Sequence, residues 1–211
     1  MIKKANSAPA DKVLRRRRKP EAAESEILSA AENFLRESPF RDMTIDDVMS
    51  RTGLSRPSFY EYFRDRNQLV IKLAERVSGR HAAICAIWLR SEQPIEALRN
   101  MMHEFAEFFA SEGHLMRALI DAANHDGGVE DAYRRALQRG IDEAAQKIRV
   151  DADSGLINLE GFDAQDLAAA LIAITNNHFI DKLGRRPQAD PATVAETLIG
   201  IWMRVLYGNS R

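Results

Sequence analysis

The segment from Thr44 to Phe63 constrains the fold of this chain more than any other stretch. It consists of a short helical pattern, TIDDVMSR, a glycine at position 53, and a second short pattern, SRPSFYEYF, that begins at Ser55. Thr44 is predicted to cap the first helix with Asp47 as its reciprocal carboxylate, and the glycine gives the backbone freedom for a reversal. This order predicts a helix-turn-helix, the arrangement that places one helix in the major groove of DNA.

The second helix of this motif carries side chains suited to contacting DNA. Ser55 is expected to cap it, and Pro57 falls within its first turn, where a missing N–H costs nothing. Arg56 has the planar fork that can bind O6 and N7 of one guanine together. Tyr60 and Tyr62 carry hydroxyls that can reach phosphate oxygens. The motif therefore predicts a DNA-binding protein.

Residues 44–69, TIDDVMSRTGLSRPSFYEYFRDRNQL, resemble the N-terminal signature of the TetR family of bacterial transcriptional repressors. Members usually carry His at position 62 and Lys at position 66, and the Tyr and Arg found here both keep a hydrogen-bond donor. The resemblance implies base contacts from residues 56–58 and phosphate contacts from positions 44, 60, 62 and 66. With the capping serine and a basic arm, the predicted DNA-binding residues are Arg15, Arg16, Arg17, Arg18, Thr44, Ser55, Arg56, Pro57, Ser58, Tyr60, Tyr62 and Arg66.

The basic arm is the stretch before the first predicted helix. Its charges are Lys12 and the run Arg15, Arg16, Arg17, Arg18 and Lys19. Like charges repel one another, so residues 1–20 are expected to be disordered in isolation. Beside a helix-turn-helix, such an arm can follow the phosphates or occupy a minor groove, and a merely solvated tail is the alternative. Residues 1–66 carry 14 Lys and Arg against 11 Asp and Glu, and the remainder 16 against 20, so positive charge gathers beside the motif.

Apolar residues recur at helical spacing almost throughout the rest of the chain, without an alternating strand pattern of useful length. Together with the motif, this pattern predicts an all-α fold of about nine helices. A helix-turn-helix domain is expected at 21–66 and a helical ligand-binding and dimerisation domain at 67–211. Helix one is expected at 21–37, helix four at 67–90, helix five from Pro94, helix six at 113–123, helix seven up to about 150, helix eight at 163–184 and helix nine from just after Asp190-Pro191 to Gly208. The pair Gly127 and Gly128 is expected to break the chain after helix six.

Helices eight and nine are unusually apolar for terminal helices. Residues 167–174 read LAAALIAI and residues 199–203 read IGIWM, so a monomer would expose a wide apolar face. A twofold dimer that buries both helices in a four-helix bundle solves this problem and spaces two recognition helices for successive major grooves. In the TetR family these helices form the dimer. The resemblance extends to the ethionamide-regulator (EthR-like) subgroup through the basic arm, SRPSFYEYF and the terminal IWMRVLYGNSR.

The middle helices carry Met and aromatic stripes that are compatible with either an ordinary core or a cavity wall. In related regulators a lipophilic effector lies between these helices, and an Asn in helix eight holds it. Thr175 and Asn176 are equal candidates for that anchor. The predicted ligand-binding residues are Trp88, Leu98, Met101, Phe105, Phe109, Tyr133, Leu137, Thr175, Asn176 and Trp202.

Other classes of protein find less support in the sequence. No convergent catalytic constellation or phosphate-binding Gly loop is evident, so neither an enzyme nor a cofactor is expected. His81 with Cys85, and His103 with Glu107, are i, i+4 pairs that each offer two metal ligands where zinc generally needs three or four. The single cysteine, the missing secretory signal and the absence of a membrane-span pattern favour a cytoplasmic protein.

The function that the sequence and the resemblance favour is that of a TetR-type repressor. Such a protein binds a palindromic double-stranded DNA operator as a homodimer and is released by a small lipophilic ligand in its C-terminal domain. Two alternatives stay open, a DNA-binding dimer without an effector and a metal-sensing repressor.

Overall fold

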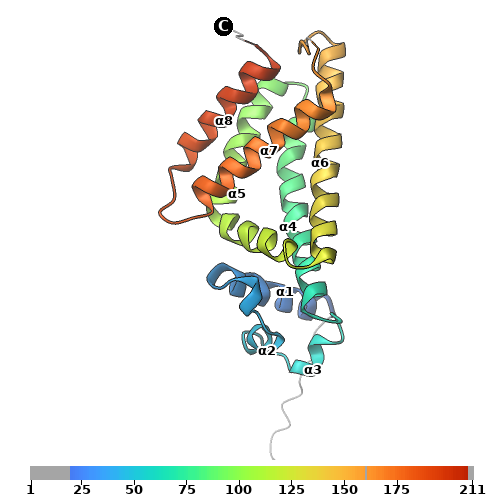
Figure 1. Cartoon of the computed structure of the whole chain (residues 1–211), viewed down its shortest axis with the longest axis vertical. Helices are drawn as coiled ribbons and strands as arrows, with labels where there is room; N and C mark the ends of the chain where they lie inside the picture. The colour runs from blue at the N-terminus through green and yellow to red at the C-terminus, as the bar shows by residue number, and fades with distance from the viewer. Residues whose placement is uncertain (1–19, 160, 209–211) are drawn as a thin grey trace, which may run out of the picture.

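The computed structural model describes residues 20–159 and 161–208, and within these ranges the protein is built from helices. The elements are α1 (Pro20–Glu37), the 3₁₀ helix η1 (Phe40–Asp42), α2 (Ile45–Ser50), α3 (Arg56–Phe59), α4 (Arg66–Leu89), α5 (Pro94–Ala123), α6 (Gly127–Asp153), α7 (Ala164–Leu183) and α8 (Pro191–Leu206). Helices α1–α3 lie at one end of an elongated molecule and α5–α8 form the other, while α4 runs from one group into the other (Figure 1). The predicted all-α class is confirmed.

An aspartate residue caps the first turn of each of the four helices α4, α6, α7 and α8. Asp65, Asp126, Asp163 and Asp190 precede α4, α6, α7 and α8, and each side chain accepts a hydrogen bond from a backbone N–H of the first turn. The first N–H groups of a helix have no partner within the helix, so a capping carboxylate satisfies them and complements the helix dipole. Helix α5 instead begins at Pro94.

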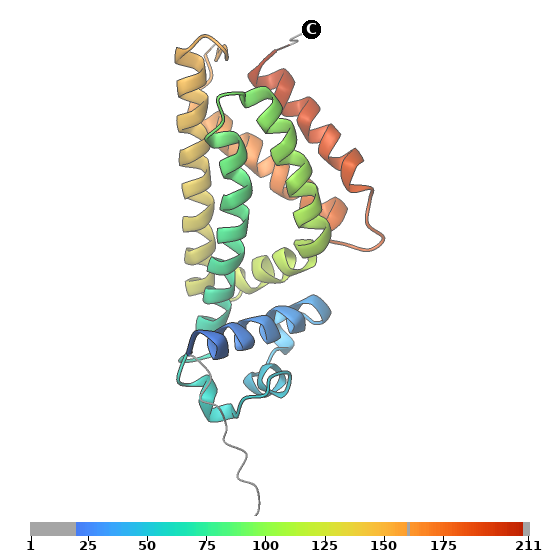
Figure 2. The same ribbon diagram turned by 180° about the vertical axis from the view of Figure 1, so that it is seen from behind.

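The prediction of about nine helices is corrected to eight α-helices within the described residues. Helices five and six of the sequence analysis are one continuous helix, α5, because Gly113 does not interrupt the backbone hydrogen bonding. Figure 2 shows that this helix bends part-way, so that its second half runs across the molecule above α1. Gly127 and Gly128 form the first turn of α6, and the break lies just before them, at residues 124–126.

Gly113 is needed for a close approach between helices. A Cβ at this position would lie 2.8 Å from the Cα of Gly184, which follows the end of α7. The neighbouring Arg117 donates from Nη1 to the Gly184 carbonyl at 3.2 Å. A side chain at position 113 would therefore push α5 away from the end of α7.

We predict that Gly113→Ala lowers the free energy of unfolding by about 1–3 kcal/mol, because the new methyl group meets backbone that cannot rotate away. Gly140→Ala is the matched control, since a Cβ there meets no atom within 4 Å. Alanine is the better helix former, so the control is expected to be neutral or stabilising by up to about 1 kcal/mol. Urea denaturation of the two variants measures both effects, and equal stabilities would contradict the close approach.

Candidate DNA-binding surface and ligand cavity

The first helix of the predicted helix-turn-helix is fixed by the capping box expected from the sequence. The Thr44 hydroxyl accepts a hydrogen bond from the Asp47 backbone N–H at 3.1 Å, and the Thr44 N–H donates to the Asp47 carboxylate at 3.1 Å. In the turn, the Gly53 N–H donates to Glu26 on α1 at 2.7 Å. Helix α2 and the turn are thus held on α1, as a helix-turn-helix requires.

Helix α3 is short and differs in one detail from the expectation. Pro57 lies in its first turn as predicted, but the Ser55 side chain makes no capping bond and instead lies 3.0 Å from the Ser58 hydroxyl. Phe59 and Phe63 are buried beneath the helix and anchor it to the core. The polar side chains of α3 consequently face away from that core.

Arg56 and Tyr60 lie together on the surface of this motif. Arg56 donates from Nη1 to both Asp46 carboxylate oxygens at 2.7 and 2.9 Å, and Tyr60 is 53% exposed. Hydrogen bonding with Tyr60, followed by the charge of Asp46, raises the pKa of Arg56 above its ordinary value. The guanine contact expected of Arg56 from the sequence would require Asp46 to release this guanidinium.

Two other predicted DNA contacts have different surroundings. Arg66 donates from Nη1 to the Met43 carbonyl at 2.9 Å, and its guanidinium lies 4.8 Å from the centroid of the Phe40 ring. Arg66 therefore packs the start of α4 against η1 and the residue that follows it. Tyr62 is half-buried against the core. Arg15, Arg16, Arg17 and Arg18 lie outside the described residues.

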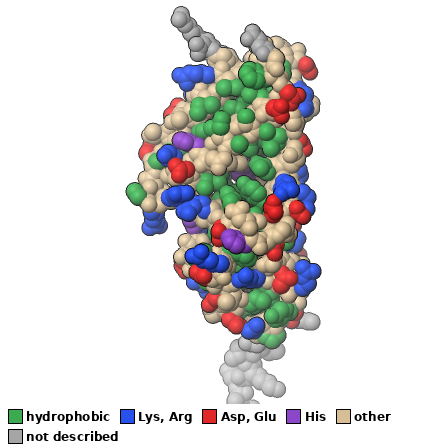
Figure 3. Space-filling view, viewed as in Figure 1, with side chains coloured by type: hydrophobic (Ala, Val, Ile, Leu, Met, Phe, Trp, Pro, Cys, Tyr) green, Lys and Arg blue, Asp and Glu red, His purple; other side chains and the backbone are tan. Residues whose placement is uncertain are grey.

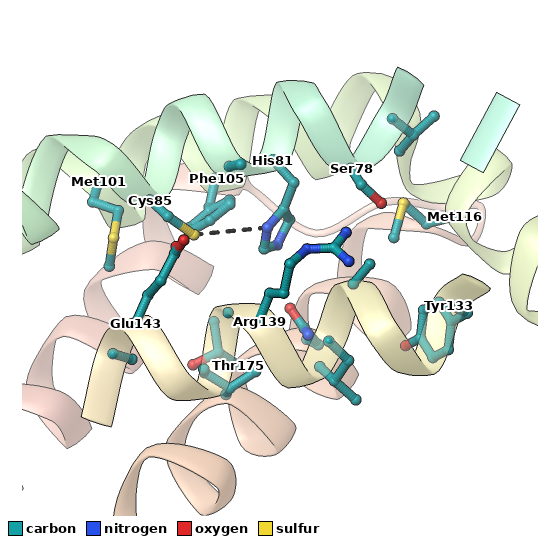
Figure 4. A pocket seen from close by; sticks show the side chains of 18 of the residues that line it. Ser78, His81, Cys85, Met101, Phe105, Met116, Tyr133, Arg139, Glu143 and Thr175 are labelled. Carbon is teal, nitrogen blue, oxygen red and sulfur yellow. Dashed lines mark hydrogen bonds between the residues drawn. The ribbon is translucent and has the colours of Figure 1, made fainter. Parts of the chain in front are cut away.

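A cavity of about 170 Å³ lies among the C-terminal helices (Figure 4). Cavities of roughly 150 Å³ in protein interiors can hold a molecule such as benzene. Eight of the ten predicted ligand-binding residues line it, namely Trp88, Met101, Phe105, Tyr133, Leu137, Thr175, Asn176 and Trp202. Leu98 and Phe109 do not line it and are fully buried, because their positions on α5 turn them into the surrounding core.

Five further polar residues of the cavity wall were not predicted from the sequence as ligand-binding. They are Ser78, His81, Cys85, Arg139 and Glu143. The i, i+4 spacing of His81 and Cys85 suggested a pair of metal ligands. The same spacing also places both residues on the face of α4 that lines the cavity. Residues three and four positions apart share one face of a helix, so this face could be found from the sequence once Trp88 was placed in the wall.

His81 and Cys85 are both neutral at physiological pH. Burial lowers the pKa of His81 to about 4, although its interaction with Asn176 acts in the opposite direction. Burial, with the nearby charge of Glu143, raises the pKa of Cys85 to about 12. The two side chains lie 3.7 Å apart between Sγ and Nδ1, and the imidazole centroid is 4.5 Å from that of Phe105. The cavity interior therefore offers weak neutral hydrogen-bonding groups and no thiolate nucleophile.

The two tryptophans of the cavity wall each donate to a partner. Trp202 Nε1 donates to the Thr175 hydroxyl at 2.8 Å, and Trp88 Nε1 donates to the Tyr207 hydroxyl at 3.1 Å. Their rings meet edge to face with centroids 5.6 Å apart. Thr175 is thus engaged in fixing Trp202, while Asn176 lies beside His81.

Four charged residues join the N-terminal helices to the C-terminal helices. Glu32 and Arg36 belong to α1, Arg80 to α4 and Glu112 to α5. Arg36 lies 2.9 Å from Glu32 and 2.6 Å from Glu112, and Arg80 lies 3.0 Å from Glu32 and 3.4 Å from Glu112. Both carboxylates are buried, with residue exposures of 6% and 8%. We call these four residues the interdomain ion-pair network; its Arg80 directly precedes His81 of the cavity wall.

Comparison with known protein families agrees with this geometry. Residues 27–73 match the family described as bacterial regulatory proteins, tetR family, and residues 98–208 match the C-terminal domain of the transcriptional regulator EthR. The HTH-type transcriptional regulator EthR of Mycobacterium tuberculosis is 30% identical over 191 residues, which cover 88% of this chain and 87% of that protein. This chain belongs to the TetR family of transcriptional regulators.

Further relatives of this TetR-family regulator extend the comparison. EthR of Mycolicibacterium smegmatis is 26% identical over 189 residues, covering 88% of this chain and 87% of that protein. A TetR-family regulator from Syntrophomonas wolfei has a similar structure, with a TM-score of 0.73 and 14% identity over 88% of this chain and 95% of that one. The structure of NalD of Pseudomonas aeruginosa, the secondary repressor of the MexAB-OprM multidrug efflux pump, has a TM-score of 0.72 and 20% sequence identity. The match covers 91% of this chain and 99% of NalD. At these identities the two structures support the fold.

Family membership makes this protein an EthR-like transcriptional regulator with a DNA-binding helix-turn-helix, not an enzyme. In residues 20–159 and 161–208, no three His, Cys, Asp or Glu side chains are grouped as a metal ion would require. His103 instead lies 3.1 Å from Glu196 of α8. None of the helices within the described ranges combines the length and apolar character of a membrane span.

We predict that the TetR-family regulator loses stability as the pH falls through the range in which His81 would titrate. Because the folded-state pKa of about 4 lies below the ordinary value of 6.5, the unfolded chain binds a proton more readily. Stability is therefore full above pH 6.5 and declines toward pH 4, by about 2 kcal/mol at pH 5.

The comparison of His81→Gln with the unmodified protein isolates this contribution. Urea unfolding at pH 7 and pH 5 is expected to show a loss that is about 2 kcal/mol smaller in the variant. His114, whose pKa burial also lowers, is present in both proteins and cancels in the difference. The same pH-dependent loss in both proteins would contradict a neutral, buried His81.

Proposed function

We propose that this regulator is a repressor that binds a palindromic operator as a homodimer and is released by a small lipophilic ligand. The observation that carries the proposal is the path of α4. This helix begins at Arg66, directly behind the recognition motif, and its residues 74–89 contribute to the wall of the cavity. A ligand in the cavity therefore contacts the same rigid element that positions the motif.

The exposed apolar face of α7 and α8 supports the homodimer. Figure 3 shows hydrophobic side chains gathered over this face, and Ile174 on α7 and Val205 on α8 are 47% and 41% exposed. Ala173 and Gly200 are small residues that allow helices to approach closely. A second copy that packs against α7 and α8 by twofold symmetry would cover this face and present two recognition helices to one operator.

Ligand and operator are expected to oppose each other through α4. A ligand changes this equilibrium only through its difference in affinity for the DNA-binding and released conformations. A ligand between α4 and α6 would favour a wider separation of the two helices. Near the start of α4, the Asn67 amide donates a hydrogen bond to the Asp126 carboxylate, just before α6, at 2.6 Å, so the two helices are also joined at this end. A change at the cavity would thus displace the base of α4, and with it α3.

Fluorescence anisotropy on DNA from the gene's own upstream region tests the proposal. We expect the full chain to bind as a dimer and to be released by one class of lipophilic ester, amide or acyl compound. Trp202→Ala is expected to weaken both ligand binding and release, because Trp202 lines the cavity. Binding that no compound disturbs would favour a DNA-binding dimer without an effector, and release by zinc or copper alone would favour a metal sensor.

A second prediction concerns the interdomain ion-pair network. Arg80→Met leaves Glu32 and Glu112 paired with Arg36, so the protein is expected to stay folded. It removes the ion pair between α4 and Glu32 of α1, and the ligand concentration needed to release DNA should rise about tenfold, within the range of typical coupling energies. Ligand affinity in the absence of DNA should stay within about threefold.

Arg41→Met is the matched control, because the Arg41 side chain is 77% exposed and lies outside the network. Tryptophan fluorescence measures ligand affinity in the absence of DNA, and anisotropy measures release. Unchanged release in Arg80→Met would contradict a coupling role for the network.

A further inference from the structure

The cavity reaches the surface between α4 and α6. A second hollow of about 230 Å³ lies on this seam and shares five wall residues with the cavity: Ala74, Ser78, Ala82, Ala136 and Arg139. The hollow is also lined by Gly79, Ala132 and Glu75, and the Glu75 carboxylate is paired with Lys72 at 2.8 Å. Apart from Glu75 and Arg139, small side chains from both helices line a continuous passage, and Arg139 is the one cationic side chain among the described residues that line either hollow.

Arg139 is placed to bind a group of the ligand. Its side chain extends from α6 toward Ser78 and His81 on α4 (Figure 4). Arg139 is exposed and, within the described residues, forms no ion pair, whereas its neighbour Arg134 is paired with Glu130 and Arg149 donates to Gln165. A guanidinium beside a hydroxyl, with no carboxylate engaging it, is well suited to a planar anion.

The rest of the cavity fits an elongated apolar chain. Its wall includes residues from Ala74 to Leu89 on α4 and from Val129 to Ala144 on α6. At 1.5 Å per residue, each stretch spans about 22 Å along its helix. A volume of about 170 Å³ spread over such a length makes the space narrow rather than round.

We infer that the effector is an amphipathic acid, an alkyl chain that ends in a carboxylate. This inference rests on the proposed ligand-released regulator and names the chemical class of its ligand. The chain occupies the apolar cavity, and the carboxylate binds the Arg139 guanidinium and the Ser78 hydroxyl at the opening between α4 and α6. The head group would then bridge the two helices whose separation controls the base of α4.

Glu143 limits which acids fit. It lies one turn beyond Arg139 on α6, and its charge acts on Cys85 in the cavity wall. A second anionic group on that side of the cavity would be repelled. The site therefore favours a monocarboxylate over a dicarboxylate.

Ligands of matched chain length test the inference on the full-length protein. Decanoate, methyl decanoate and decylammonium share one alkyl chain and differ in the charge of the head. The quenching of tryptophan fluorescence measures their affinities, since both tryptophans of the chain line the cavity. Decanoate is expected to bind about tenfold more tightly than the ester, the effect of one charge-assisted hydrogen-bonding contact at a partly hydrated site.

Arg139→Gln separates charge from packing. We expect this substitution to lower the affinity for decanoate about tenfold and to leave the affinity for methyl decanoate within about twofold of its original value. Arg134→Gln, an exposed α6 substitution outside the cavity wall, should change neither affinity. Release of operator DNA by decanoate should show the same dependence on Arg139.

The outcomes that overturn the inference are distinct from failure of the proposed function. Equal affinities for acid and ester, tighter binding of decylammonium, or equal weakening of acid and ester by Arg139→Gln would each overturn the carboxylate site. If the ester released DNA in these cases, the proposed ligand-released regulator would stand. If none of the three probes bound while operator DNA did, the carboxylate inference would be overturned and the effector part of the proposed function would fail this test.

Discussion

The interdomain ion-pair network is the contact on which the relation between the two ends of the molecule depends. Two buried carboxylates, Glu32 and Glu112, are each within ion-pair distance of both Arg36 and Arg80. Buried carboxylates are costly unless they are paired, so α1, α4 and α5 must stay in register for the network to be satisfied. An apolar contact would tolerate sliding, but a network of fixed hydrogen-bonding geometry changes energy sharply when one helix moves. It therefore favours a small number of discrete arrangements of the N-terminal helices.

The cavity is built beside this network and shares α4 with it. Arg80 belongs to the network and the next residue, His81, lines the cavity among three phenylalanine rings of α5. The cavity wall and the interdomain ion pairs thus lie within one helical turn of each other. Because α4 is a rigid helix that starts at the recognition motif, a displacement at residues 78–85 has a short physical path to α3. No longer relay of side chains is needed.

Local rules predicted most of the fold and failed where tertiary contacts override them. The Thr44–Asp47 capping box, Pro57 in the first turn of α3 and the starts of α7 and α8 follow from neighbours within four residues, and the structure confirms them. The sequence predicted a separate helix beginning at Gly113. Its actual constraint is the backbone of Gly184, more than seventy positions away, which no local pattern reveals.

For the candidate site too, local spacing predicted some residues correctly, and tertiary packing decided the others. Helical spacing placed eight of the ten expected residues in the cavity wall, yet it did not tell wall from core for Leu98 and Phe109, since both belong to the same apolar stripe of α5. Arg139 was missed because a charged residue on α6 has the pattern of a solvated face. Only the packing of α4 against α6 turns that position toward an opening. Apolar patterning thus identifies the walls of such a cavity, while Arg139, which we propose as the partner of the ligand head group, lies at its edge, where sequence periodicity carries no signal.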